Sequence, residues 1–244
     1  MDDFQLYQQS GIGDMRIRAD VIFFDLFFTL IMPKCEGLPS EGEILGLTHE
    51  QWEYYAEDED LYRARALGRV QDPVRMVEAV LEKMDMTADQ GQIAEIIARR
   101  EERMRCSICE IDSVITDVLT EIKNRGYKLC LISNADDIDI KHYKESRLYT
   151  LFDEAIFSCE VGHMKPQREI YQIACDAMRI TPEHGIFIGD GGSDELRGAR
   201  DAGMRTILSE YLVEHEPAFR KRVKAYANFV VSDFRDILTI LDQL

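Results

Sequence analysis

A short, continuous apolar run is the first strong pattern in this chain. Residues 21–24 (VIFF) are uniformly apolar, and the run ends abruptly at the carboxylate of Asp25. A run of this length predicts a buried strand. An acid at the carboxyl end of such a strand would lie in the crevice where open α/β sheets bind ligands. A strand end with a solvated acid is the alternative that this segment alone leaves open.

Helical periodicity dominates the next part of the chain. Residues 47–105 place apolar side chains at three- and four-residue spacing and carry almost no strand pattern. Asp72 and Pro73 have the residue types of an N-cap and a first helical position. Thr87 is expected to cap a further helix.

Strands and helices alternate from residue 111 onward. This alternation predicts a parallel sheet with right-handed crossovers. The predicted helices cover residues 111–123, 137–147, 167–178, 194–202 and 233–244, and the predicted strands cover 128–133, 155–158, 185–189, 205–208 and 227–231. We therefore expect two parts: a core from residues 1–32 and 111–244, and a helical cap from residues 33–110 over the carboxyl edge of the sheet.

Polar residues stand where successive predicted strands end. Each has an ordinary explanation, because a Ser-Asn pair often forms a turn, a single lysine is usually solvated, and an acidic Gly-rich segment often leads into a helix. Four such coincidences at one sheet edge are hard to accept together. The residues concerned are Asp25, Ser133, Asn134, Lys165, Asp190, Asp194 and Glu195.

Composition and charge narrow the classes of partner. Apolar residues make up 45% of the 244 residues, which is typical of a folded protein. The net charge of −17 argues against nucleic-acid binding, which needs clustered Lys and Arg. No leader is evident in residues 1–20, and no apolar run approaches the roughly 20 residues that span a bilayer. We expect a cytoplasmic protein with a small-molecule substrate and no membrane partner.

Cysteine usage points to thiols rather than to a disulfide scaffold or a metal site. Six cysteines are too sparse for a disulfide framework in a chain of this length. Cys106 and Cys109 form a single C-x-x-C without the second pair that a zinc site needs. The other four cysteines are expected to be reduced, at positions 35, 130, 159 and 175.

Four motifs in order resemble the haloacid dehalogenase (HAD) superfamily of hydrolases, subfamily I type, with a helical cap after the first strand. The motifs are FFDLFFTL (23–30), LISN (131–134), the lysine of HMKPQREIY (163–171) and IGDGGSDELRGARDAGM (188–204). The resemblance extends from about residue 19 to the C-terminus. It implies a Rossmann-like, three-layer α/β/α core with a parallel sheet and a small helical cap.

The resemblance also implies a nucleophile and a metal. Asp25 would attack the substrate and form a covalent intermediate. Mg²⁺ would be held by Asp25, the main-chain carbonyl of Phe27, Asp190 and one further acid. The spacing allows either Asp194 or Glu195 as that acid.

The remaining motif residues would bind the transferring group. Ser133 and the amide of Asn134 would hold it, and Lys165 would neutralise the nucleophile and the group that it attacks.

One position departs from the phosphatase pattern. Phosphatases of the family carry a second Asp two residues after the nucleophile, and this chain has Phe27 there. Phenylalanine cannot move a proton, and an aromatic residue at this position is typical of the dehalogenase branch. The acid-rich fourth motif favours a retained metal, because acids at Asp190, Asp194 and Glu195 repel one another without a cation.

The sequence therefore predicts an Asp-nucleophile hydrolase that depends on Mg²⁺ and acts on a small anionic metabolite, with phosphorylated metabolites among the candidates. Two alternatives stay open: a metal-independent L-2-haloacid dehalogenase-like hydrolase, and a non-catalytic binding protein with the same fold. The cap would select the substrate. Its aromatic and basic candidates for facing the site, most of them expected to be structural, are Trp52, Tyr54, Tyr55, Tyr62, Arg63 and Arg65.

Overall fold

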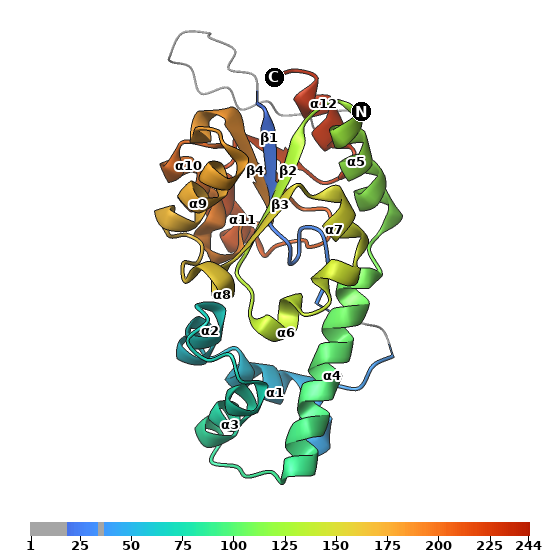
Figure 1. Cartoon of the computed structure of the whole chain (residues 1–244), viewed down its shortest axis with the longest axis vertical. Helices are drawn as coiled ribbons and strands as arrows, with labels where there is room; N and C mark the ends of the chain where they lie inside the picture. Colours follow the sequence, from blue (N-terminus) through green and yellow to red (C-terminus); the bar gives the residue numbers. More distant parts are fainter. Residues whose placement is uncertain (1–18, 34–36) are drawn as a thin grey trace.

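A six-stranded parallel sheet forms the centre of the protein. The computed structural model describes residues 19–33 and 37–244. The strands lie in the order β3-β2-β1-β4-β5-β6 (Figure 1), which confirms the predicted parallel sheet. They are β1 (Val21–Phe24), β2 (Lys128–Ser133), β3 (Glu154–Phe157), β4 (Gly185–Gly189), β5 (Arg205–Ser209) and β6 (Phe229–Val231).

Helices cover both faces of this sheet and complete the expected α/β/α layers. Each face buries its own apolar cluster, because strands that are covered on both sides must be apolar on both sides. One face packs against α5 (Ser113–Asn124), α7 (Arg147–Leu151) and α12 (Asp236–Leu241), and the other against α9 (Arg168–Met178), α10 (Glu195–Ala202) and α11 (Pro217–Lys224).

Four further helices lie beyond the carboxyl ends of the strands, at the bottom of Figure 1, and we call them the cap helices. They enclose a separate apolar cluster that includes Trp52, Val80 and Ile96. The division into a core and a cap domain at residues 33 and 110 stays a prediction. The cap helices are α1 (His49–Ala56), α2 (Glu59–Ala66), α3 (Pro73–Lys83) and α4 (Gln90–Cys109).

The bounds of several predicted helices differ from those observed, as at α12, which covers Asp236–Leu241 rather than 233–244, and two of the differences have a clear local cause. Helix α4 begins after Asp89 rather than at Thr87, because Asp89 and Gln92 cap each other's backbone N–H groups in a capping box. The helix expected over 137–147 is broken into α6 (Asp137–Ile140), a 3₁₀ turn and α7, since Ser146 is extended, with ψ of 159°.

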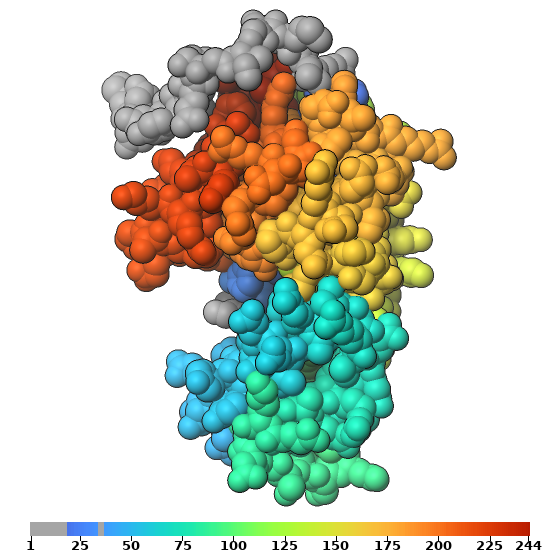
Figure 2. All heavy atoms as spheres, turned by 90° about the vertical axis from the view of Figure 1, so that its left-hand side faces the viewer, coloured from blue at the N-terminus to red at the C-terminus, as the bar shows by residue number. Residues whose placement is uncertain are grey.

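Helix α2 packs closely against the core at α8 (Ser158–Val161). Gly68, just after α2, has a φ of +66°, and a Cβ there would lie 2.2 Å from the carbonyl oxygen of Cys159. Only glycine combines this conformation with this approach. In Figure 2 the teal atoms of this part of the cap abut the gold atoms of the core.

Among the five cysteines that the structure describes, the states agree with the sequence expectation except at one position. Cys109, Cys130, Cys159 and Cys175 are free thiols. Cys106 is disulfide-bonded, so the expectation of a thiol there is wrong. Cys35 lies outside the described residues. Among the helices of residues 19–33 and 37–244, none is both long and apolar enough to cross a bilayer.

Candidate active site

Asp25 stands at the point where the sheet reverses its strand order. It directly follows β1, between β2 and β4, and its backbone N–H donates to the carbonyl of Ile188 at 2.9 Å. Its carboxylate is buried and accepts a hydrogen bond from the Thr29 hydroxyl at 3.1 Å. Phe28 has a φ of +62° in the tight turn that brings Thr29 back toward Asp25. The acid is therefore fixed in the ligand-binding crevice of an open α/β sheet.

Lys165 reaches the same point from the segment before α9. Its ammonium group is buried and contacts the carboxylates of Asp25 and, at 2.5 Å, Glu195. Burial lowers the pKa of Lys165, but the two carboxylates outweigh burial and raise it above its ordinary value. The lysine is therefore charged at neutral pH.

The side chain of Asn134 fixes the backbone at Lys165. Its amide oxygen accepts from the Lys165 backbone N–H at 2.7 Å, and its amide nitrogen donates to the Lys165 carbonyl at 3.1 Å. Asn134 therefore ties the end of β2 to the lysine segment, a contact that the sequence did not predict.

Three buried carboxylates converge beside this lysine. Ligand oxygens of Asp25, Asp190 and Glu195 lie within 4.8 Å of one another. Burial, and then the charge of Asp25, raise the pKa of Asp190 to about 6 and that of Glu195 well above its ordinary value. Carboxylates this close are a typical oxygen-ligand set for Mg²⁺.

Glu195, rather than Asp194, belongs to this cluster. Asp194 points to the surface and pairs with Arg197 at 3.0 Å and Arg222 at 3.6 Å. Left-handed backbone at Ser193 and Asp194 starts α10 abruptly and turns Glu195 inward. Its carboxylate also accepts the backbone N–H of Gly191 at 3.1 Å.

Ser133 ends β2 on the same edge of the sheet. Its hydroxyl is fully buried and has no hydrogen-bond partner among the described residues. A buried hydroxyl without a partner is costly, so it marks a position where a ligand or water would restore the bond.

A cavity of about 380 Å³ joins the carboxylate cluster, Lys165 and Asn134 to the cap, and Ser133 is not among the residues that line it. Phe27 and Phe28 line it from the turn after Asp25. Of the cap candidates, only Tyr62 and Arg65 line it among the described residues. The other residues that line it are Asp25, Pro33, Glu53, Glu57, Arg100, Arg103, Met104, Asn134, Asp139, Lys165, Asp190, Gly192, Ser193 and Glu195.

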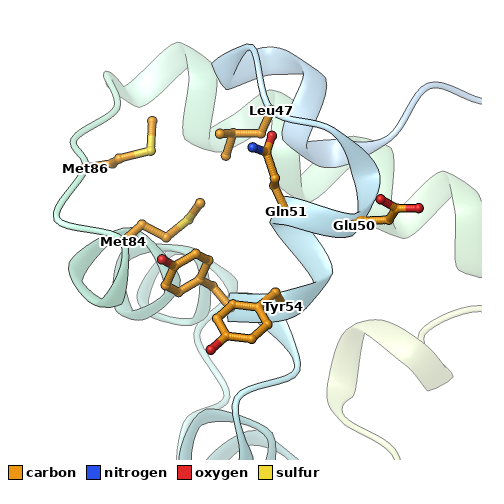
Figure 3. Close-up of a pocket in the computed structure, with 7 residues that line it drawn as sticks. Leu47, Glu50, Gln51, Tyr54, Met84 and Met86 are labelled. Atoms are coloured by element: carbon orange, nitrogen blue, oxygen red, sulfur yellow. The ribbon is translucent and has the colours of Figure 1, made fainter.

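The remaining cap candidates lie elsewhere. Trp52 is buried in the apolar cluster of the cap, and Arg63 is exposed. Tyr54 and Tyr55 line a second pocket of about 450 Å³ at the far side of the cap, with Met84 and Met86 (Figure 3). These aromatics therefore do not face Asp25.

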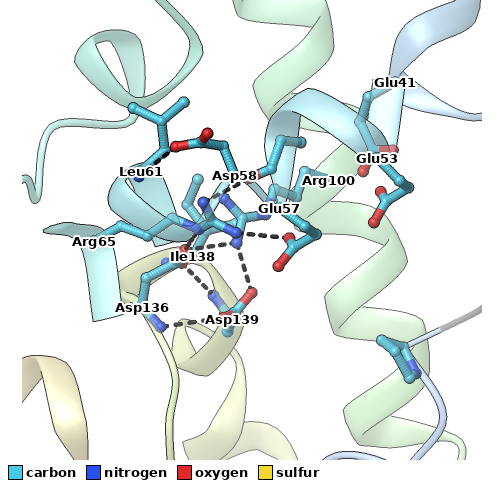
Figure 4. A network of polar contacts seen from close by, with 12 residues as sticks. Glu41, Glu53, Glu57, Asp58, Leu61, Arg65, Arg100, Asp136, Ile138 and Asp139 are labelled. Carbon is cyan, nitrogen blue, oxygen red and sulfur yellow. Dashed lines mark hydrogen bonds and ion pairs between the residues drawn. The ribbon is translucent and has the colours of Figure 1, made fainter. Parts of the chain in front are cut away.

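Two cap arginines meet on one core carboxylate (Figure 4). Asp136, two residues after Asn134, contacts Arg65 at 3.1 Å and Arg100 at 2.6 Å. Arg65 also pairs with Glu57 at 2.6 Å, and Arg100 with Asp139 at 2.9 Å. The network therefore couples α2 and α4 to the loop after β2.

A third arginine holds the neighbouring cap acids. Arg103 contacts Glu41 at 2.8 Å and Glu53 at 3.9 Å, and it donates to the carbonyl of Pro33 at 2.9 Å. Ligand atoms of Glu41, His49 and Glu53 lie within 4.8 Å of one another, with Arg103 as their counter-cation.

Replacing Asp136 by asparagine is expected to destabilise the protein by about 3 kcal/mol or more, because two largely buried guanidinium groups lose their shared anion. Urea unfolding measures this change. Glu121→Gln, which breaks an exposed pair with Arg125, is the control and should cost less than about 1 kcal/mol. Equal losses of unfolding free energy in the two variants would contradict a stabilising buried ion-pair network between cap and core.

Some contacts at the site had no recognisable signal in the sequence. His215 lies 2.7 Å from the carbonyl oxygen and 3.4 Å from a carboxylate oxygen of Asp190. The Tyr171 hydroxyl donates to the carbonyl of Glu195 at 2.8 Å. A single histidine in a loop 25 residues after Asp190 carries no pattern that would place it there.

Comparisons with known proteins agree with this geometry. A sequence profile of haloacid dehalogenase-like hydrolases matches residues 19–203. Bifunctional epoxide hydrolase 2 of Rattus norvegicus is 37% identical over 92 residues, which cover 36% of this chain and 16% of that protein. Glyceraldehyde 3-phosphate phosphatase of Methanothermobacter thermautotrophicus is 35% identical over 96 residues, which cover 38% and 42%. The chain thus spans less than half the length of these relatives.

Solved structures share the fold. An L-2-haloacid dehalogenase superposes with a TM-score of 0.68 at 18% identity, covering 92% of this chain and 99% of that one. A HAD family enzyme from Bacteroides thetaiotaomicron, in complex with magnesium and inorganic phosphate, gives a TM-score of 0.62 at 18% identity, covering 82% and 98%. At these identities the similarity establishes the architecture alone.

Proposed function

Because this chain belongs to the haloacid dehalogenase-like hydrolases, we propose that it is a Mg²⁺-dependent phosphomonoesterase with Asp25 as its nucleophile. One observation carries the proposal: Asp25, Asp190 and Glu195 gather around a single ammonium group, that of Lys165. Three carboxylates against one ammonium leave two negative charges, which one divalent cation would balance. Asp25, Asp190, Glu195 and the carbonyl of Phe27 would hold the ion.

The residues of the site have separate roles in this reaction. A carboxylate oxygen of Asp25 would attack phosphorus and the bond from phosphorus to the ester oxygen would break. The leaving alkoxide would take its proton from solvent water, because Phe27 cannot supply one. Water then releases inorganic phosphate from Asp25. Lys165 and the free hydroxyl of Ser133 would bind the phosphoryl oxygens. Bound Mg²⁺ would reduce the repulsion between the dianion and the carboxylates.

Metal-independent dehalogenation is the second candidate, and Phe27 favours it. Halide leaves without a proton, so an aromatic residue two positions after the nucleophile costs that reaction nothing. The carboxylate of a haloacid would, however, need a cation, and each arginine that lines the cavity among the described residues is paired with a protein carboxylate.

A substrate screen with and without Mg²⁺ separates the candidates. Phosphate release that depends on Mg²⁺ supports the proposal. Halide release from L-2-haloacids in the presence of a chelator would replace it with the dehalogenase. Ligand-induced melting shifts without any turnover would indicate a binding protein instead.

Millimolar Mg²⁺ is expected to raise the melting temperature, because it binds only the folded cluster. Asp190→Asn should remove most of this shift. Asp201→Asn, an exposed acid on α10, is the control and should keep it. Since the pKa of Asp190 is about 6 without metal, protons compete with the ion below that pH, and the shift should shrink between about pH 7.5 and about pH 5.5. A wild-type protein with no shift would contradict the metal site.

A further inference from the structure

The wall of the cavity opposite Asp25 carries more carboxylates than cations. Three guanidinium groups stand there, those of Arg65, Arg100 and Arg103. They pair with five carboxyl groups, those of Glu41, Glu53, Glu57, Asp136 and Asp139. Glu53, Glu57 and Asp139 line the cavity together with the three arginines, while the buried acids Glu41 and Asp136 neutralise the same arginines from outside the lining, so the wall as a whole is negative.

The raised pKa values of two of these acids agree with an excess of carboxylates over cations in this wall. Burial raises the pKa of Glu57 even though Arg65 is paired with it. Burial, and then the charge of Asp136, raise the pKa of Asp139. A positive charge that enters this side of the cavity would stabilise both carboxylates.

Aromatic side chains line the same cavity, two of them from the turn after Asp25. Phe27, Phe28 and Tyr62 line the cavity together with these acids. Aromatic faces attract ammonium groups, most strongly where water is excluded. Carboxylates and aromatic rings in one cavity therefore favour a substrate that carries a cationic group. A second anionic group on the substrate would gain little, because the arginines of the cavity are already paired with protein carboxylates.

We propose that the leaving group of the substrate carries an ammonium group and no second anionic group, so that the enzyme prefers phosphate monoesters of small amino alcohols. This inference rests on the proposed phosphatase function, in which the phosphate lies against Lys165 and Ser133. The rest of the substrate then extends toward Glu53, Glu57 and Asp139.

Three esters of equal length test the charge of the leaving group: 2-aminoethyl phosphate, 2-hydroxyethyl phosphate and phosphoglycolate. With Mg²⁺ present, kcat/KM is expected to fall in that order, by about tenfold or more between the first and the last. Equal values, or a preference for phosphoglycolate, would overturn the inference and leave the phosphatase proposal intact.

Glu57→Gln tests whether this wall recognises the ammonium group, because the substitution removes one negative charge that lines the cavity and keeps the shape of the side chain. Its kcat/KM for 2-aminoethyl phosphate should fall several-fold relative to that for 2-hydroxyethyl phosphate. The control is Glu95→Gln, whose exposed carboxylate pairs with Arg99 outside the cavity. An unchanged ratio in Glu57→Gln would remove Glu57 from the recognition site.

The affinities of non-hydrolysable analogues test the preference for an ammonium group even if none of the three esters is cleaved. Calorimetry with Mg²⁺ compares 3-aminopropylphosphonate with 3-phosphonopropionate, which mimic the ammonium and carboxylate esters. Tighter binding of the aminophosphonate would support recognition of an ammonium group by this wall, and absence of turnover of any ester would then count against the phosphatase proposal alone. Equal or tighter binding of 3-phosphonopropionate would refute the inference.

Discussion

Replacing Asp25 by asparagine is expected to reduce turnover to background, a loss of more than about 10⁴-fold. The amide is nearly isosteric with the carboxylate but is a poor nucleophile, so no covalent intermediate forms. The same substitution takes one charge out of a cluster in which Asp190 and Glu195 are already hard to ionise. Asp25→Asn is therefore expected to melt no lower than the wild type in the absence of metal.

Steady-state kinetics and thermal melting together test this prediction. Asp20→Asn is the matched control, because Asp20 is an exposed acid at the opposite end of β1 and should be neutral for activity. A folded Asp25→Asn protein with wild-type rates, contamination excluded, would refute covalent catalysis at Asp25. Mass spectrometry of quenched wild-type turnover should show the phosphorylated aspartate that the variant lacks.

Local patterns predicted the sheet and the edge that carries the site. The apolar runs of β1 and β4 are short and uniform because both faces of the sheet are covered. Such a run predicts a buried strand by itself, without knowledge of the neighbouring strands. Asp25 and Asp190 follow such strands directly, and Ser133 is the last residue of one. Their place at the carboxyl edge follows from parallel topology alone.

Contacts between distant segments could not be predicted in this way. Arg100 and Asp136 are 36 residues apart, and no periodicity links a helix in the cap to a loop after β2. The choice between Asp194 and Glu195 depends on left-handed backbone at two non-glycine residues, which side-chain type does not reveal. The aromatic residues of the cap lie in three different places: Tyr62 in the cavity, Trp52 in the apolar cluster of the cap, and Tyr54 and Tyr55 in the second pocket. Their spacing along the helices could not predict this, because packing between helices decides which face of each helix is covered.

Phe27→Asp is expected to raise turnover of phosphate esters with poor leaving groups by about 10²-fold or more, because it returns a proton donor to the position where related phosphatases have one. An aryl phosphate should gain less, since its leaving group needs little protonation. Comparing kcat/KM for an alkyl and an aryl ester in both proteins isolates this effect. Phe27→Leu is the matched control: it removes the ring, adds no acid and should give no gain for the alkyl ester.

Stability is the competing effect in this experiment. Phe27 lines the cavity and packs against the apolar core, and an added carboxylate beside Asp25, Asp190 and Glu195 increases their repulsion. Mg²⁺ should offset this cost, so melting is compared with and without the ion before any rate is interpreted. A folded, metal-binding Phe27→Asp protein without gain on any phosphate ester would contradict the phosphomonoesterase proposal. The aromatic residue would then belong to a reaction whose leaving group departs without a proton, which is the distinction between the two candidate chemistries.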